Sequence, residues 1–251
     1  MEGEVASFLA SLFQLMEQYQ DIWVKGKLSK PGIRETESRY ELIKSIASQY
    51  DRPFTVLDIG ANLGYFAIRL TEDFPNCTVV AIEGIYSNWL KEVLSQNESE
   101  RVILLERKFS LDDLRKLAKV EHFDLVLAMS VIHHIKGSFA EVLETVRSLG
   151  DNVIAETATE DRACGQSSVK ESFIPEDASI LGHGKSHLKG PKRPVFLLQQ
   201  KRTHLAERFI GCTRPDKLEM EIESDFSTKK MTNRGETRDW HRGINLKTFR
   251  H

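Results

Sequence analysis

The chain lacks the features of a disulfide-stabilised, zinc-binding or membrane-spanning protein. It has three cysteines, Cys77, Cys164 and Cys212, and no two of them form a CxxC pair. An odd number of distant cysteines indicates reduced thiols in a cytoplasmic protein rather than a disulfide framework or a zinc site. No apolar run approaches the roughly 20 residues that span a bilayer. The amino-terminal Met-Glu-Gly-Glu is not followed by the apolar block of a secretory signal. We therefore expect a cytoplasmic protein without a membrane span.

The composition indicates a folded chain with an uneven charge distribution. Hydrophobic residues make up 40% of the 251 residues and charged residues 29%, which allows one large domain with additions. The net charge of −2 conceals 16 Lys and Arg against 8 Asp and Glu in residues 185–251. This basic final quarter either docks an anionic partner or pairs with the acidic remainder of the chain, and the sequence leaves both readings open.

Two helices are predicted before the first strand of the main domain. Residues 5–22 carry apolar side chains at three- and four-residue steps, and a second helical pattern runs from Tyr40 to Tyr50. We therefore assign residues 1–52 to an amino-terminal helical addition, which either packs on the sheet or forms a lid over a ligand. Arg34 and Arg39 would face the ligand from a lid, and otherwise they are solvated or paired structural residues.

From residue 54 onward strands and helices alternate, which predicts an α/β fold with a doubly wound, mostly parallel sheet. This domain should cover residues 53–201. Residues 202–251 are predicted to form a basic carboxyl-terminal extension that packs on the domain, with a possible strand at 218–222. The expected strands are 54–59, 77–82, 102–106, 123–129, 152–156, 179–181 and 194–200, and the expected helices are 63–74, 87–94, one starting at a capping box at 110–113, and 138–149.

The segment 58–64 reads Asp-Ile-Gly-Ala-Asn-Leu-Gly and joins a buried strand to a helix. A dinucleotide site has three glycines in a G-x-G-x-x-G spacing, and the helix start then holds a pyrophosphate. Here the third glycine is missing, and Asp58 would repel a pyrophosphate. The turn therefore disfavours NAD and favours a ligand with a cationic or hydroxyl group.

Four segments together resemble the class I S-adenosylmethionine-dependent methyltransferases. Residues 56–64 resemble the first motif of that family, 79–83 the second, 123–135 the motif of the fourth strand, and 152–157 the fifth strand. The resemblance implies a seven-stranded sheet and S-adenosylmethionine as cofactor. Its implied cofactor-binding residues are Asp58, Gly60, Ala61, Asn62, Gly64, Tyr65, Glu83, Phe109, Met129 and Ser130.

The resemblance also implies individual roles. Asp58 would lie near the amino group of the cofactor, directly or through water, and Glu83 would accept hydrogen bonds from both ribose hydroxyls. Many relatives place an aspartate near the adenine amino group, but this chain has Arg-Lys-Phe-Ser at 107–110. Phe109 either packs on the adenine or belongs to the core. Met129 and Ser130 would lie under the sulfonium.

The candidate catalytic residues are His133, His134 and Glu156. A neutral imidazole near physiological pH suits proton removal from an acceptor. Because the two histidines are adjacent, we expect only one to face the cofactor, and we favour His133 slightly. Glu156, at the end of the fifth strand, should open onto the same edge, where it either binds the acceptor or structures the site.

No metal is expected, because the glycines beside His183 and His187 disfavour the helix that would bring these two histidines together. The basic residues of this loop instead suit an anionic acceptor. We therefore expect methyl transfer to an oxygen or nitrogen of a small or glycan-like, anionic acceptor, a class that includes phosphate-bearing molecules. Two alternatives are an RNA-modifying methyltransferase of the tRNA type and a catalytically inactive S-adenosylmethionine-binding regulatory protein.

Overall fold

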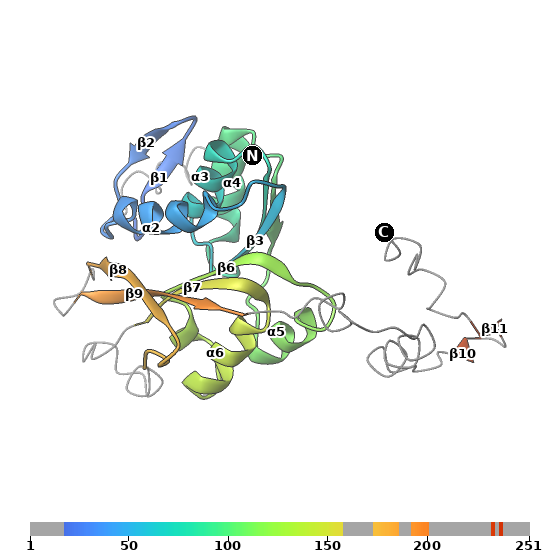
Figure 1. Ribbon diagram of the computed structural model, residues 1–251. Coiled ribbons are helices and arrows are strands. Elements are labelled where there is room, and N and C mark those ends of the chain that lie inside the picture. The colour runs from blue at the N-terminus through green and yellow to red at the C-terminus, as the bar shows by residue number, and fades with distance from the viewer. Residues whose placement is uncertain (1–17, 158–172, 186–191, 201–231, 234–235, 238–251) are drawn as a thin grey trace. The chain divides into compact units, whose positions relative to one another are not determined.

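The computed structural model describes residues 18–157, 173–185 and 192–200, together with residues 232–233 and 236–237 (Figure 1). The chain divides into two units, residues 1–200 and 201–251. In the second unit β10 (Thr232–Asn233) pairs antiparallel with β11 (Glu236–Thr237). The helix expected at residues 5–17, the strand expected at 218–222 and the packing of residues 202–251 on the domain fall outside the described residues and stay predictions.

The first unit is built on a seven-stranded sheet with the order β5-β4-β3-β6-β7-β9-β8 (Figure 1). The five strands from β5 to β7 are parallel, β9 is antiparallel to β7, and β8 is antiparallel to β9. This confirms the doubly wound, mostly parallel fold. The strands are β3 (Phe54–Ile59), β4 (Cys77–Ile82), β5 (Val102–Leu105), β6 (Phe123–Met129), β7 (Gly150–Glu156), β8 (Ser179–Gly184) and β9 (Arg193–Gln199).

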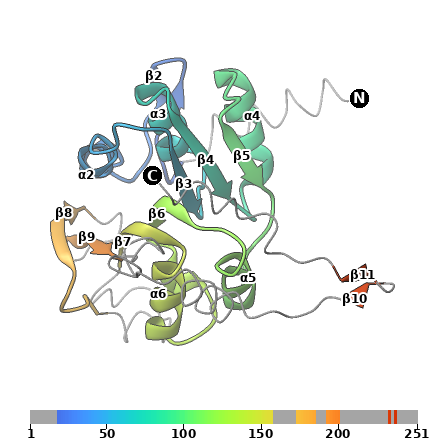
Figure 2. The same ribbon diagram turned by 45° about the vertical axis from the view of Figure 1, so that its right-hand side comes forward.

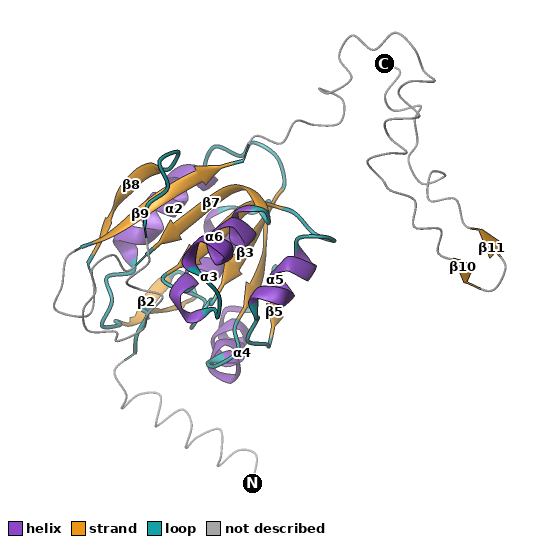
Figure 3. Cartoon of the chain, turned by 90° about the horizontal axis from the view of Figure 1, so that it is seen from below, coloured by secondary structure: helices purple, strands orange, loops and turns teal. Residues whose placement is uncertain are grey.

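Helices cover both faces of the sheet, and each face has its own apolar core. On one face lie α2 (Glu37–Ala47), α3 (Tyr65–Asp73) and α4 (Ser87–Asn97), packed on a buried cluster that includes Tyr40, Phe66 and Leu90. On the other lie α5 (Leu111–Leu117) and α6 (Phe139–Arg147), with Leu114 and Val142 in a second cluster (Figures 2 and 3). The capping box predicted at Ser110 is present.

The amino-terminal addition differs from the prediction, because it contains a β-hairpin. Strand β1 (Ile22–Val24) pairs antiparallel with β2 (Lys27–Lys30), so the expected helix does not extend to residue 22. Lys25 and Gly26 have φ values of 47° and 75°. Two successive left-handed residues form the tight turn that the twist of a hairpin favours. Gly26 therefore belongs to the turn between the two strands.

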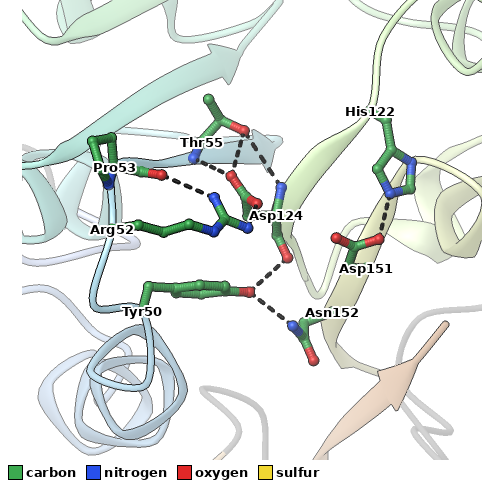
Figure 4. A network of polar contacts seen from close by, with 8 residues as sticks. All are labelled: Tyr50, Arg52, Pro53, Thr55, His122, Asp124, Asp151 and Asn152. Atoms are coloured by element: carbon green, nitrogen blue, oxygen red, sulfur yellow. Dashed lines mark hydrogen bonds and ion pairs between the residues drawn. The ribbon is translucent and has the colours of Figure 1, made fainter. Parts of the chain in front are cut away.

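A polar network ties the amino-terminal edge of the sheet together (Figure 4). The Tyr50 hydroxyl donates to the carbonyl of Asp124 at 2.6 Å and accepts from the Asn152 side chain at 2.8 Å. Arg52 forms an ion pair with Asp124 at 2.6 Å, and the amide of Thr55 donates to the same carboxylate at 2.8 Å. These contacts join the segment between α2 and β3 to β3, β6 and β7, at the edge opposite to the strand ends that form the site described next.

Candidate functional site

A cleft of about 990 Å³ lies at the carboxyl ends of β3, β4 and β6. The strand order reverses between β3 and β6, and ligands of open α/β sheets bind at such a reversal. Eight of the predicted site residues line the cleft: Gly60, Asn62, Glu83, Phe109, Met129, Ser130, His133 and His134. Five others are not part of the lining: Asp58, Ala61, Gly64, Tyr65 and Glu156. Tyr65 points its hydroxyl away from the cleft, to Arg69 and Glu37.

The two glycines of the turn are required by close packing against the protein itself. Gly60 has a φ of 74°, and a Cβ there would lie 2.7 Å from Cγ2 of Val131. Gly64 has a φ of 77°, and its Cβ would lie 2.5 Å from Cδ1 of Leu90. Residues with a side chain rarely adopt a positive φ. Both the backbone conformation and the short Cβ distances therefore favour glycine at these two positions. Their expected approach to a cofactor stays a prediction.

Asp58 is a buried carboxylate with an unused acceptor. Its side chain is 1% exposed, and Oδ2 has no hydrogen-bond partner. Burial, followed by the negative charge of Glu83, raises the pKa of Asp58 to about 7. The neighbouring Asn62 holds a strained φ of 54°, and its Oδ1 is also buried without a partner. Two buried acceptors therefore lack a partner at this turn, one on Asn62 in the lining of the cleft and one on Asp58 just outside the lining, and they suit a ligand group with several N–H donors.

Glu83 joins the turn after β3 to the turn after β4. Its Oε2 accepts from the amide of Asn62 at 2.7 Å, and its Oε1 accepts from the amides of Ile85 and Tyr86 at 2.7 and 3.1 Å. A carboxylate has about four acceptor positions. Three are used here, so Glu83 has room for one further donor, where the sequence analysis expected two ribose hydroxyls.

Both histidines line the cleft, although only one was expected to face it. They lie in the short 3-10 helix η1 (Ile132–His134), and their ring centroids are 4.1 Å apart. His133 is buried, while His134 is more exposed. Partial burial, then the positive charges of Lys108 and Arg193, lower the pKa of His134. His134 is therefore mainly neutral near pH 7, and a neutral imidazole can accept a proton.

Glu156 lies behind the cleft and is fully paired. It is 0% exposed and receives two hydrogen bonds from Arg39, at 2.8 and 2.9 Å, and one ion pair from Arg34 at 2.6 Å. Burial alone would raise its pKa, but the Arg39 hydrogen bonds and both arginine charges outweigh burial and hold the pKa of Glu156 below its ordinary value. Of the two roles considered for Glu156, this geometry favours structuring the site over binding the acceptor. For Arg34 and Arg39 it favours a paired structural role.

The amino-terminal addition reaches this region through Arg34, which the sequence analysis considered, and through Tyr19 and Gln20, which it did not select. Tyr19 lines the cleft, and the Gln20 side chain contacts the glycine turn. Arg34 donates to the hydroxyl of Ser130 at 2.6 Å, and Ser130 has a φ of 61°. No local pattern marks Gln20, because the amides that it binds lie more than 40 positions further along the chain.

Basic side chains also gather at the cleft. Arg107, Lys108, Lys136 and Arg193 line it, against Glu83 as the acidic member of the lining. Arg193 begins β9 and donates to the Ser130 hydroxyl at 3.2 Å. Of the predicted basic loop, residues 186–191 lie outside the described ranges. No group of three metal-ligating side chains occurs among the described residues.

Comparison with known proteins agrees with this fold. A family model described as a methyltransferase domain matches residues 29–206. Two Escherichia coli proteins, both described as the O-antigen chain terminator bifunctional methyltransferase/kinase WbdD, are 26% identical over 207 residues, covering 75% of this chain. The chain spans 28% of the length of these relatives.

Two solved structures share the fold. A crystal structure of WbdD has a TM-score of 0.61 at 22% identity, covering 76% of this chain and 46% of that one. The N-terminal domain of EvdMO1, solved in the presence of SAH and D-fucose, has a TM-score of 0.55 at 12% identity, covering 78% and 97%. Within the described part of the chain, no helix has the length and apolar character needed to span a bilayer. The chain belongs to the methyltransferase-domain family, and its sheet and glycine turn are those of a class I S-adenosylmethionine-dependent methyltransferase.

Proposed function

We propose that this chain transfers the methyl group of S-adenosylmethionine to an oxygen or nitrogen of a small or glycan-like, anionic acceptor. The observation that carries the proposal is the unpartnered Oδ2 of buried Asp58 beneath the glycine turn. A buried carboxylate oxygen without a donor costs free energy. The α-ammonium group of the cofactor supplies both a positive charge and the missing N–H donors.

The other cofactor contacts follow from the groups that line the cleft. The free acceptor position of Glu83 suits a ribose hydroxyl, and Phe109 offers an aromatic face for the adenine. Met129 and Ser130 end β6, where they would lie nearest the sulfonium. The cofactor supplies an electrophilic methyl group, so the protein has to bind, orient and deprotonate the acceptor. A cleft of about 990 Å³ is at the upper end of ligand pockets and has room for an acceptor beside the cofactor.

The histidine pair is the candidate base for the acceptor. When a hydroxyl oxygen or a neutral amine nitrogen of the acceptor attacks the methyl group, the thioether S-adenosylhomocysteine leaves and the acceptor atom has to lose a proton, which the neutral imidazole of His134 can take. His133, directly beside it, would orient the acceptor or the ring of His134. The glutamate behind the cleft, Glu156, would act only by fixing Arg34 and Arg39.

The anionic character of the acceptor rests on the basic lining of the cleft. Lys108, Lys136 and Arg193 would attract a phosphate or carboxylate and hold it beside the histidines. The relatives support a glycan-like acceptor, because WbdD is described as an O-antigen chain terminator and EvdMO1 was solved with D-fucose. They do not favour an RNA-modifying enzyme or an inactive regulatory protein.

A labelled-methyl transfer screen tests the proposal. The protein and S-adenosylmethionine with a labelled methyl group are incubated with cell extract, which is then separated into glycan, small-molecule, RNA and protein fractions. We expect label in the glycan or anionic small-molecule fraction and a loss of about 10²- to 10⁴-fold for His134→Gln, the usual contribution of a general base. Label confined to RNA, or transfer unaffected by His134→Gln, would contradict the acceptor or the base assignment, respectively.

A further inference from the structure

Gln20 makes an unusual long-range contact with the glycine turn. Its side chain is 6% exposed, and its Oε1 accepts from the backbone amides of Leu63 at 3.2 Å and Tyr65 at 3.3 Å. Leu63 belongs to the turn, and Tyr65 is the first residue of α3. A single side chain thus binds the turn and the start of the helix, more than 40 residues away in the sequence.

This contact replaces a missing helix cap. The first amides of a helix have no partner inside it and are usually capped by a Ser, Thr, Asp or Asn side chain. The N-cap of α3 is Gly64, which has no side chain to accept a hydrogen bond. Because close packing requires glycine at this position, the acceptor has to come from elsewhere. Gln20 supplies it.

Gln20 is itself held in a fixed place. The amide of Arg34 donates to the carbonyl of Tyr19 at 3.2 Å, and the amide of Ile33 donates to the carbonyl of Gln18 at 2.7 Å. Gly32 packs so closely that a Cβ there would lie 2.5 Å from the carbonyl carbon of Gln20. These contacts fix the backbone around Gln20, so its side chain meets the turn without a large loss of conformational entropy.

We infer that Gln20 is a positioning residue for the cofactor. By accepting from Leu63 and Tyr65, it fixes the turn that follows Asp58 and that carries Asn62, one of the residues lining the cleft. It also occupies the first amide of α3, that of Tyr65, at the kind of helix start that binds a pyrophosphate in dinucleotide folds, which suits a donor without phosphate. The hairpin addition is thereby a structural part of the cofactor site. This inference rests on the proposed function only where it concerns affinity for the cofactor.

The test separates the acceptor from the volume of the side chain. Gln20→Met keeps the length but removes the acceptor, whereas Gln20→Glu keeps an oxygen at the same position. Gln96→Met is the matched control, because Gln96 is exposed on α4 and bonds Glu92 on its own helix. Calorimetric titration with S-adenosylhomocysteine should give a dissociation constant about tenfold or more higher for Gln20→Met, the size expected when a buried amide loses its partner.

The other variants set the limits of that result. Gln20→Glu should stay within roughly threefold of the wild type, and Gln96→Met should be unchanged. In steady-state kinetics Gln20→Met should raise KM for S-adenosylmethionine more than it lowers kcat, which a loss of global stability would not do selectively. Equal affinity for wild type and Gln20→Met would overturn the inference.

Hydrogen exchange provides a readout that does not depend on the cofactor. In the ligand-free wild type the amides of Leu63 and Tyr65 should be protected, and they should exchange faster in Gln20→Met but not in Gln20→Glu. Failure of the wild type to bind S-adenosylhomocysteine would refute the proposed function alone, and unprotected amides in the wild type would refute the Gln20 cap alone. The wild-type measurement also decides the matter if Gln20→Met does not fold.

Discussion

Replacement of Asp58 by asparagine should stabilise the ligand-free protein and weaken cofactor binding. The folded-state pKa of Asp58 is raised from 3.8 to about 7, chiefly by burial. Between these two pKa values the folded state holds a proton that the unfolded state has released. The stability that Asp58 contributes in its protonated form is fully present below pH 3.8 and is lost as pH rises through about 7. At 1.36 kcal/mol per tenfold change, the carboxylate costs up to about 4 kcal/mol at pH 8. Asparagine carries no such charge.

Urea unfolding of ligand-free wild type and Asp58→Asn at pH 5 and pH 8 measures this cost. The difference in unfolding free energy between the two proteins should favour Asp58→Asn by about 2–3 kcal/mol more at pH 8 than at pH 5. The comparison between pH values removes pH-independent effects of the substitution on packing. A difference that does not change with pH would refute the interpretation of Asp58 as an uncompensated buried carboxylate.

The same residue should make cofactor binding depend on pH. The cofactor ammonium favours the ionised form of Asp58, so the affinity of wild type for S-adenosylhomocysteine should fall up to about tenfold per pH unit below pH 7. Asp58→Asn should bind about 10- to 100-fold more weakly at pH 8, and it should lose this pH dependence. Titration calorimetry at several pH values gives both quantities, and a wild-type affinity that is flat between pH 5.5 and 7 would contradict the assignment.

Three further substitutions test other parts of the structure. Gly60→Ala should weaken S-adenosylhomocysteine binding at least tenfold in a titration, since its Cβ would lie 2.7 Å from Val131 at a φ of 74°; wild-type affinity would show that the turn adapts. Glu156→Gln should lower the unfolding free energy by about 3–5 kcal/mol, because two buried arginines lose their counter-charge. The depressed pKa of Glu156 means that this stabilisation is present above its unfolded pKa and is lost in acid, so the penalty in urea unfolding should shrink as pH falls through the folded pKa. Tyr50→Phe should cost about 1–2 kcal/mol of stability by the loss of its bonds to Asp124 and Asn152, with unchanged cofactor affinity, because that network lies at the far edge of the sheet.

The parallel sheet was predictable from the sequence because each of its strands is a short apolar run bounded by turn residues. The first and last residues of β3, β4 and β6 are those expected from the sequence. The hairpin was not predicted, since Ile22, Trp23 and Val24 also continue the helical spacing of the residues before them. A strand of three residues is too short to show the alternation of apolar and polar residues that would distinguish it from a helix.

The candidate site was predictable where a residue ends a strand and unpredictable where it depends on distant partners. Glu83 and Ser130 were found through the resemblance to class I methyltransferases, and their positions at the carboxyl ends of parallel strands bring them to one edge of the sheet. The burial of Glu156 could not be seen, because it depends on Arg34 and Arg39 more than 100 residues earlier. Gln20 was missed for the same reason, since a glutamine before a hairpin has no local signature as a helix cap.

The central claim, that the glycine turn binds S-adenosylmethionine, is tested most directly by thermal unfolding with S-adenosylhomocysteine and with NAD. A ligand at 100 times its dissociation constant stabilises by about 2.7 kcal/mol. For a folded domain of this size the melting temperature should therefore rise by roughly 5–10 °C with S-adenosylhomocysteine, whereas NAD should leave it unchanged. A rise with NAD and none with S-adenosylhomocysteine would contradict the account.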